Sequence, residues 1–233
     1  MKALTVDAQG LLSLQELPIP SYGACQALVK MRSCGVCSGT DMKLIHHTFK
    51  NFDTYPAILG HEGVGEVVEI GEKVENLRRG DLVLLPFLEG KIGEYTPGWG
   101  AYSEYALVGD AEAYIRCGMG PGTKQWSEGY LAQTVLGPED RVNPVEAAMI
   151  VTFREVLSAI RRFGFQPNQN IVVLGAGPVG LCFTRFLKLL GIKTVITTDI
   201  LDEKVETALE MGADYAFNSA KCDIIHEVRT LFP

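Results

Sequence analysis

Hydrophobic positions follow different patterns in the first and the last part of this chain. From residue 1 to about residue 141, short apolar runs are interrupted by glycine, proline and aspartate, which predicts strands joined by tight turns. Valines beside glycines between Gly63 and Gly71 indicate a bent strand of a small barrel. The expected strands cover residues 27–31, 63–70, 81–86 and 102–108.

A helix start closes this strand-rich region. Asn143 provides an N-cap, Pro144 suits the first helical position, and Glu146 stands at the third. Apolar residues then recur at helical spacing, and we expect the helix to run to about Phe163, where Gly164 ends it.

After this helix, apolar strands alternate with helices. This order is typical of a parallel sheet with crossover helices, whose strands are fully buried. We therefore predict a β domain over residues 1–145, followed by an α/β domain over residues 146–233. The expected strands of the second domain cover residues 171–174, 194–198 and 215–217, and the expected helices cover 178–190, 202–211 and 222–231.

Composition narrows the class of protein and of partner. The 47% of hydrophobic and 21% of charged residues exclude a disordered chain. A net charge of −7 argues against nucleic acid or an anionic membrane as the partner. No apolar run approaches the roughly 18 residues of a membrane-spanning helix, and no hydrophobic signal region begins the sequence. We expect a cytoplasmic protein whose six cysteines are reduced thiols or metal ligands.

A glycine-rich loop is the strongest sign of a cofactor. Gly175, Gly177 and Gly180 form a G-x-G-x-x-G motif directly after an apolar strand, and Pro178 and Val179 begin the next helix. In such a loop the first glycine allows a tight turn, the second lets the backbone approach a pyrophosphate, and the third allows helix and strand to pack closely. The free N–H groups of the helix start would bind the phosphates.

Asp199 ends the next expected strand, where an acidic side chain can accept hydrogen bonds from an adenosine ribose. A carboxylate there repels a 2′-phosphate, which predicts NAD rather than NADP. The alternative is a glycine-bearing turn in an α/β domain that binds no ligand.

Cysteine and histidine in the first domain indicate a metal site. Cys34 and Cys37 form a C-x-x-C pair, and the segment GHEGVGEVVEIG, which contains His61 and Glu62, follows some twenty residues later. Thiolate and imidazole are ligands that suit zinc. A zinc ribbon needs a second cysteine pair, which is missing. A thioredoxin-type motif follows a strand and begins a helix, and the flanking residues here do not fit that pattern.

Taken together, these motifs resemble the medium-chain dehydrogenase/reductase family, in its zinc-dependent alcohol and polyol dehydrogenase branch. The resemblance covers essentially the whole chain and depends on three segments: Gly35, Cys37, Thr40 and Asp41; GHEGVGEVVEIG; and the glycine loop. It implies a GroES-like catalytic domain joined to a Rossmann domain. It also implies one catalytic zinc, a nicotinamide cofactor, and an alcohol or carbonyl substrate.

The resemblance assigns roles to individual residues. Cys37 and His61 match the first catalytic zinc ligands, and Glu62 matches the acid beside the metal. Asp41 matches the carboxylate that orients the ligating histidine. Thr40 matches the hydroxyl that passes the substrate proton toward solvent while hydride goes to the nicotinamide. The alternatives are a buried apolar cysteine, a structural histidine, and a helix cap formed by Thr40 and Asp41.

The sequence departs from the family pattern between Cys37 and Thr40, which are separated by one extra residue. The loop therefore bulges, or Ser38 takes the role of Thr40. Lys43 replaces a histidine that many members use for proton transfer. The structural zinc of many members should not bind, because its four-cysteine lobe is missing.

The third zinc ligand of the family falls, by count, on Val151, which cannot bind a metal. Glu155, one helical turn further on, is a weak candidate for that ligand.

The second domain matches half of a dinucleotide-binding domain. A complete domain has two β-α-β-α-β halves, and this sequence provides one. We expect a fragment of a longer enzyme or a shortened gene product. Three functions stay open: a zinc-assisted NAD-dependent dehydrogenase, a zinc-independent reductase of the same family, and a non-catalytic nucleotide-binding protein. An unpaired sheet edge in a partial domain favours a homo-oligomer.

Overall fold

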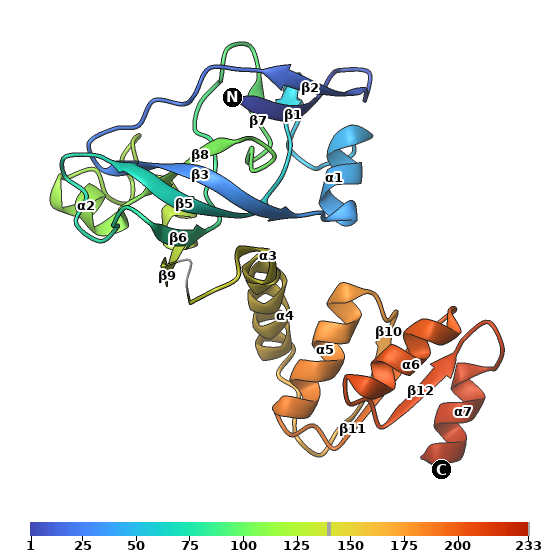
Figure 1. The fold of residues 1–233 in the computed structure, drawn as a ribbon. Helices are drawn as coiled ribbons and strands as arrows, with labels where there is room; N and C mark the ends of the chain where they lie inside the picture. Colours follow the sequence, from blue (N-terminus) through green and yellow to red (C-terminus); the bar gives the residue numbers. More distant parts are fainter. Residues whose placement is uncertain (139–140, 233) are drawn as a thin grey trace. The chain divides into compact units, whose positions relative to one another are not determined.

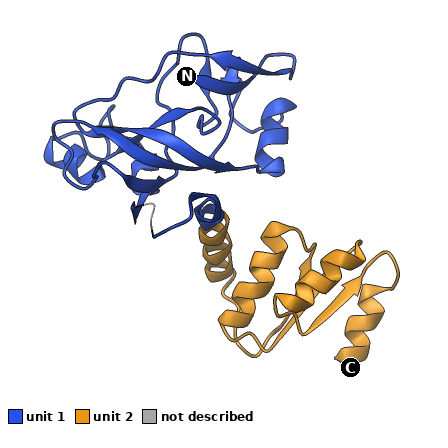
Figure 2. Cartoon of the chain, viewed as in Figure 1, with its two compact units in different colours: residues 1–151 blue, residues 152–233 orange. Residues whose placement is uncertain are grey.

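The computed structural model of this chain describes residues 1–138 and 141–232. It divides into two compact units, Met1–Val151 and Thr152–Pro233 (Figure 2). The domain boundary between residues 145 and 146 stays a prediction.

Two sheets form the first unit (Figure 1). One has the strand order β2-β1-β4-β7 and the other the order β8-β3-β5-β6-β9. Their strands are β1 Lys2–Val6, β2 Leu12–Glu16, β3 Gln26–Gly35, β4 Ala57–Ile58, β5 Glu62–Ile70, β6 Asp81–Leu84, β7 Thr96–Pro97, β8 Tyr105–Gly109 and β9 Thr134–Pro138. All four strands expected for this region are present, with boundaries that differ by a few residues.

The long antiparallel pair β3–β5 is the centre of the larger sheet, and it is bent as the valine and glycine pattern predicts. Its register shifts between Leu28 and Val29 and again between Met31 and Ser33. Such shifts bend a strand and increase its twist. Gly65 lets the two strands approach each other closely, because a Cβ there would lie 2.2 Å from a side-chain atom of Val29.

Two helices of this unit are absent from the sequence-based expectation. They are α1 (Ser38–Ile45) and α2 (Ala111–Arg116), and a 3₁₀ turn at Glu128–Leu131 also forms. The expectation for the flanks of the C-x-x-C pair was wrong: Cys34 lies in strand β3, and Cys37 is the N-cap of α1. Helix α1 is short and polar at its start, so its hydrophobic periodicity is weak.

The connecting helix forms as two pieces, α3 (Pro144–Ala147) and α4 (Met149–Phe163). The side chain of Asn143 caps α3 by accepting a hydrogen bond from the backbone N–H of Val145 at 2.9 Å. Gly164, at φ 66°, follows the last residue of α4 in the left-handed region that favours glycine.

The second unit contains a parallel sheet of order β10-β11-β12 with its helices (Figure 1). Strand β11 is buried, as expected, but β10 is not, and Leu174 is 79% exposed. The prediction of fully buried strands was wrong for β10 and β12, which are the two edges of the described sheet. The elements are β10 Asn170–Leu174, α5 Pro178–Leu189, β11 Thr194–Asp199, α6 Asp202–Glu210, β12 Tyr215–Asn218 and α7 Ile224–Leu231. None of the helices in the described residues is long and apolar enough to cross a membrane.

Candidate active site

Strand pairing brings together the two segments that contain the candidate zinc ligands. At the end of the β3–β5 ladder, Gly35 pairs with Glu62. Cys37 follows Gly35 by two positions, and His61 directly precedes β5. A Cβ at residue 35 would lie 2.4 Å from Oε2 of Glu62, so the glycine makes room for the carboxylate.

The donor atoms of Cys37, His61 and Glu62 form a cluster that suits a metal ion. One sulfur, one imidazole nitrogen and one carboxylate oxygen all lie within 4.8 Å of one another. Glu62 is buried, and the other two residues are half-buried. Sulfur, nitrogen and oxygen donors in this combination fit zinc, and three protein ligands leave a coordination position for substrate or water.

Helix α1 begins at the cysteine of this cluster. The backbone N–H groups of Thr40 and Asp41 donate to the Cys37 carbonyl, at 3.1 and 2.9 Å. The N-terminal end of the helix therefore lies at the cysteine. Sγ of Cys37 lies 3.7 Å from Oγ1 of Thr40, so the hydroxyl borders the cluster.

His61 faces a buried carboxylate on its other side. Its Nδ1 lies 3.7 Å from Oδ1 of Asp41, and both atoms are buried and have no hydrogen-bond partner among the described residues. The other carboxylate oxygen of Asp41 accepts a hydrogen bond of 2.7 Å from the Tyr102 hydroxyl. Burial, together with this hydrogen bond, raises the pKa of Tyr102 well above its ordinary value, so the phenol stays a donor. Asp41 is thus held where it can orient the imidazole of a metal-binding histidine.

The segment from Cys37 to Asp41 forms the first turn of α1 rather than a bulged loop. Thr40 and Asp41 lie inside the helix, so they are not its cap. Ser38 and Lys43 are exposed.

Val151 and Glu155 lie in different environments. Val151 is buried in the apolar cluster that contains Val64, Leu82 and Leu84, and it is part of the core. Glu155 is an exposed residue of α4.

Trp99 is a site residue that the sequence reasoning missed. Its ring centroid lies 5.4 Å from that of His61 and 5.6 Å from that of Phe49. Its φ of 67° is unusual for a bulky side chain and marks a position where the surroundings impose the backbone conformation. The available signal was the sequence Gly98-Trp99-Gly100, which is typical of a tight turn.

A cavity of about 310 Å³ adjoins this tryptophan. Its walls are mostly aromatic and aliphatic, with few polar groups. The lining residues are Phe52, Phe87, Leu88, Pro97, Gly98, Trp99, Ser127 and Gly129.

The glycine loop of the second unit connects β10 to α5. Gly175 has a φ of 95°, and a Cβ at Gly180 would lie 1.8 Å from the Gly175 carbonyl oxygen, so both positions need glycine. Gly177 is the N-cap of α5, and no side chain forms a capping hydrogen bond there. A Cβ added at Gly177 would meet no side chain or distant backbone of the described residues within 4 Å. The helix start, with Pro178 and Val179 as its first residues, is therefore open for a phosphate.

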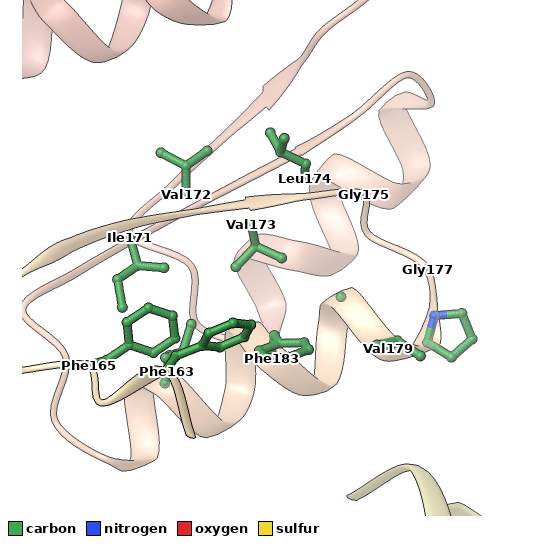
Figure 3. Close-up of a pocket in the computed structure, with 13 residues that line it drawn as sticks. Phe163, Phe165, Ile171, Val172, Val173, Leu174, Gly175, Gly177, Val179 and Phe183 are labelled. Carbon is green, nitrogen blue, oxygen red and sulfur yellow. The ribbon is translucent and has the colours of Figure 1, made fainter. Parts of the chain in front are cut away.

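An apolar surface borders the same loop (Figure 3). Ile171 and Val173 point from β10 toward Phe163, Phe165 and Phe183 on one side of the strand. This side lines a cavity of about 540 Å³, which also reaches Gly175 and Gly177.

Asp199 lies at the end of β11, as predicted. Its carboxylate accepts hydrogen bonds from the backbone N–H groups of Ala176, at 2.8 Å, and Leu201, at 3.1 Å. These bonds hold the pKa of Asp199 below its ordinary value. The carboxylate is thus ionised beside the glycine loop, where it can accept hydrogen bonds from a ribose.

Cys34 lacks the lowered pKa that a thioredoxin-type motif needs in its first cysteine. Its thiol contacts the Gly35 carbonyl, and burial raises its pKa to about 12. The attacking thiol of a thioredoxin-type motif has a lowered pKa, so the raised pKa of Cys34 argues against that interpretation, although the flanking strand and helix are present.

Two family models match the chain. Residues 23–147 match the alcohol dehydrogenase GroES-like domain, and residues 178–233 match the zinc-binding dehydrogenase model. The chain belongs to this alcohol dehydrogenase family, which confirms the predicted resemblance and the predicted fold class.

Individual relatives agree with this assignment. The alcohol dehydrogenase of Geobacillus stearothermophilus is 31% identical over 98% of this chain and 66% of its own length. The NAD-dependent alcohol dehydrogenase of Sulfurisphaera tokodaii is 29% identical over 94% of this chain and 64% of its own length. The crystal structure of galactitol-1-phosphate dehydrogenase from Escherichia coli superposes with a TM-score of 0.74 at 25% identity, covering 99% of this chain and 65% of that one. The chain therefore spans slightly less than two thirds of the length of these relatives.

Proposed function

We propose that this chain binds one zinc ion through Cys37, His61 and Glu62, and that it transfers hydride between an alcohol or polyol and NAD. The observation that supports this proposal is the three-donor cluster within 4.8 Å, with its histidine facing a buried carboxylate. Zinc, when bound, acts as a Lewis acid toward the substrate oxygen.

The surrounding residues have separate roles. Asp41 orients His61 and is itself held by Tyr102. Thr40, whose hydroxyl borders the cluster, accepts the substrate proton and passes it toward solvent.

The aromatic cavity beside Trp99 would take the carbon skeleton of the substrate. Its apolar walls favour a hydrocarbon part and leave the hydroxyl group to the metal cluster.

The dinucleotide would bind at the second unit. Gly175, Gly177 and Gly180, with Pro178 and Val179, form the open helix start for its pyrophosphate. Asp199 would accept hydrogen bonds from the ribose and repel a 2′-phosphate, so NAD is preferred over NADP. Titration with NADH and NADPH tests this preference, and equal affinities would contradict it.

Metal analysis of the purified chain is the central experiment. We expect about one zinc per chain in the wild type and a strong loss in Cys37→Ser, because a sulfur ligand is removed. Cys222→Ser, in the second unit, is the matched control and should keep its zinc. Absence of zinc from the wild type would instead favour a zinc-independent reductase, which Val151 in the core already makes the second candidate.

Further parts of the proposal concern the molecule as a whole. A homo-oligomer is supported by the exposed apolar side chains of β10. We keep the prediction of a cytoplasmic protein whose catalytic domain ends near residue 145, with no nucleic-acid or membrane partner.

A further inference from the structure

Two cysteines far apart in the sequence meet in the first unit. Sγ of Cys25 lies 3.7 Å from Sγ of Cys117, across a sequence separation of 92 residues. Cys25 is 2% exposed, whereas Cys117 is exposed. Both are free thiols, and neither belongs to the metal cluster or the glycine loop.

Backbone contacts hold this pair together. Cys25 directly precedes β3, and its carbonyl accepts a hydrogen bond of 2.9 Å from the N–H of Asp110. Asp110 is the N-cap of helix α2, and Cys117 is the C-cap of the same helix. One short helix therefore fixes both the position of Cys117 and its distance from β3.

A disulfide requires the sulfur atoms to approach to about 2.05 Å. The sulfur atoms would have to approach by somewhat less than 2 Å, at the exposed end of α2. The residue after Cys117, Gly118, has a φ of 72°, and a Cβ there would meet no atom within 4 Å. Cys117 is the exposed C-cap of this six-residue helix, whose buried residues are Ala113 and Tyr114.

The two thiols differ in how they can react. Burial and the hydrogen bond between the two thiols raise the pKa of Cys25 to about 11, so little of it is thiolate at neutral pH. Cys117 is the thiol that solvent and small reagents can reach first.

We propose that Cys25 and Cys117 form a reversible dithiol–disulfide modification site that takes low-molecular-weight disulfides such as oxidised glutathione. The Cys117 thiolate attacks one sulfur of the small disulfide, forms a mixed disulfide and releases one thiolate. Cys25 then gives its proton to solvent and attacks the Cys117 sulfur. The Cys25–Cys117 bond forms, and the second thiolate leaves. The two cysteines are oxidised, and the small disulfide is reduced to two thiols.

The cross-link would act on the wall of the aromatic cavity. Helix α2 carries Tyr114, which stacks on Tyr130 with a centroid distance of 4.6 Å. Tyr130 in turn stacks on Phe87 at 5.9 Å, and Phe87 lines the cavity beside Trp99. Oxidation would link the C-terminal end of α2 covalently to the residue before β3. It would therefore restrict the movement of Tyr114 and, through Tyr130, of Phe87 in the cavity wall.

Intact-mass and peptide mass spectrometry of the purified full chain in glutathione redox buffers test the proposal. In the wild type we expect loss of two hydrogen atoms, a Cys25–Cys117 peptide, and only a transient glutathione adduct on Cys117. Cys25→Ala should accumulate that adduct, because the resolving thiol is missing, and Cys117→Ser should form neither product. Cys222→Ser is the control and should behave as the wild type.

Thermal unfolding gives a second readout that does not need a variant. Closing a loop of this length should raise the melting temperature of the oxidised wild type by about 5 °C or more. A wild type that keeps the Cys117 adduct as long as Cys25→Ala does would overturn the proposal. So would the absence of the cross-linked peptide even in fully oxidised glutathione.

Discussion

Single glycines decide whether both sites can form. Gly35 leaves room for Glu62 in the metal cluster, and Gly180 lets α5 pack against the loop that follows β10. Gly177 differs from these two, since a Cβ added there would meet no side chain or distant backbone of the described residues within 4 Å. The first two glycines are therefore needed by the fold, and the third is needed only if a ligand approaches.

The pair Gly180→Ala and Gly177→Ala separates these roles. Gly180→Ala should lower the free energy of unfolding by about 3 kcal/mol or more, because its methyl group overlaps the Gly175 carbonyl. Gly177→Ala should leave stability within about 0.5 kcal/mol of the wild type and weaken NAD binding. Thermal unfolding and NAD titration check both variants. Unchanged NAD affinity in Gly177→Ala would contradict the phosphate site.

A single substitution of Asp41 tests the candidate metal site. Asp41→Asn should reduce zinc affinity by about 10–100-fold, because the histidine loses the carboxylate that orients it. Competition with a chromogenic chelator measures this affinity, and circular dichroism checks the fold. Asp53→Asn, on an exposed position, is the control. Equal zinc affinities for the wild type and Asp41→Asn would show that Asp41 does not orient His61.

At the scale of elements, hydrophobic patterning predicted the long strands and helices and missed short polar ones. Strands β3 and β5 and helices α5 and α6 have enough periodic positions to be recognised. Helices α1 and α2 have eight and six residues, and hydrogen bonds from distant residues contact both, through Asp41 and Leu44 in α1 and the N-cap Asp110 in α2. The candidate metal site depends on α1, so sequence motifs located its residues while missing the helix that carries them.

Asp110 shows how a short helix is held. Its carboxylate accepts hydrogen bonds from the backbone N–H groups of Glu75, Asn76 and Ala113. Burial alone would raise the pKa of Asp110, but these bonds outweigh it and the pKa is lowered. Asp110→Asn should therefore lower the free energy of unfolding by about 1–3 kcal/mol at neutral pH.

The pH dependence of the same variant follows from the sign of this shift. A lowered pKa in the folded state contributes stability above the unfolded value near 4, and this contribution is lost as pH falls through the folded value. Chemical unfolding between pH 7 and pH 3 should show a smaller loss of stability in Asp110→Asn than in the wild type. If the free energy of unfolding fell equally with pH in the wild type and in Asp110→Asn, the lowered pKa of Asp110 would be contradicted.

At the scale of the whole molecule, the metal cluster and the glycine loop belong to different compact units. Each ligand should therefore stabilise its own unit. Removing zinc with a chelator should increase hydrogen exchange around α1 and the start of β5 and leave the β10–α5 loop unchanged. Adding NAD should reduce hydrogen exchange in the β10–α5 loop and leave α1 and the start of β5 unchanged. Hydrogen-exchange mass spectrometry resolves both, and a uniform response to either ligand would contradict separate sites.

The homo-oligomer is a second question at this scale. Leu174 on β10 is 79% exposed, so Leu174→Lys should leave the fold intact and reduce self-association at an apolar surface. Light scattering after size-exclusion chromatography measures the mass. Leu131→Lys, at a position 61% exposed in the first unit, is the matched control. A wild type that is monomeric, or an oligomer that persists in Leu174→Lys, would contradict this interface.

The sequence by itself determined the features that depend on neighbouring residues: the glycine loop with its strand and helix, the N-cap at Asn143, and the motifs that contain Cys37 and His61. Tertiary structure alone decided which distant side chains meet. It places Asp41 against His61, turns Trp99 toward the metal cluster, and brings Cys25 beside Cys117. Local patterns follow from the geometry of a single strand or helix, whereas these contacts depend on how sheets bend and pair across many residues.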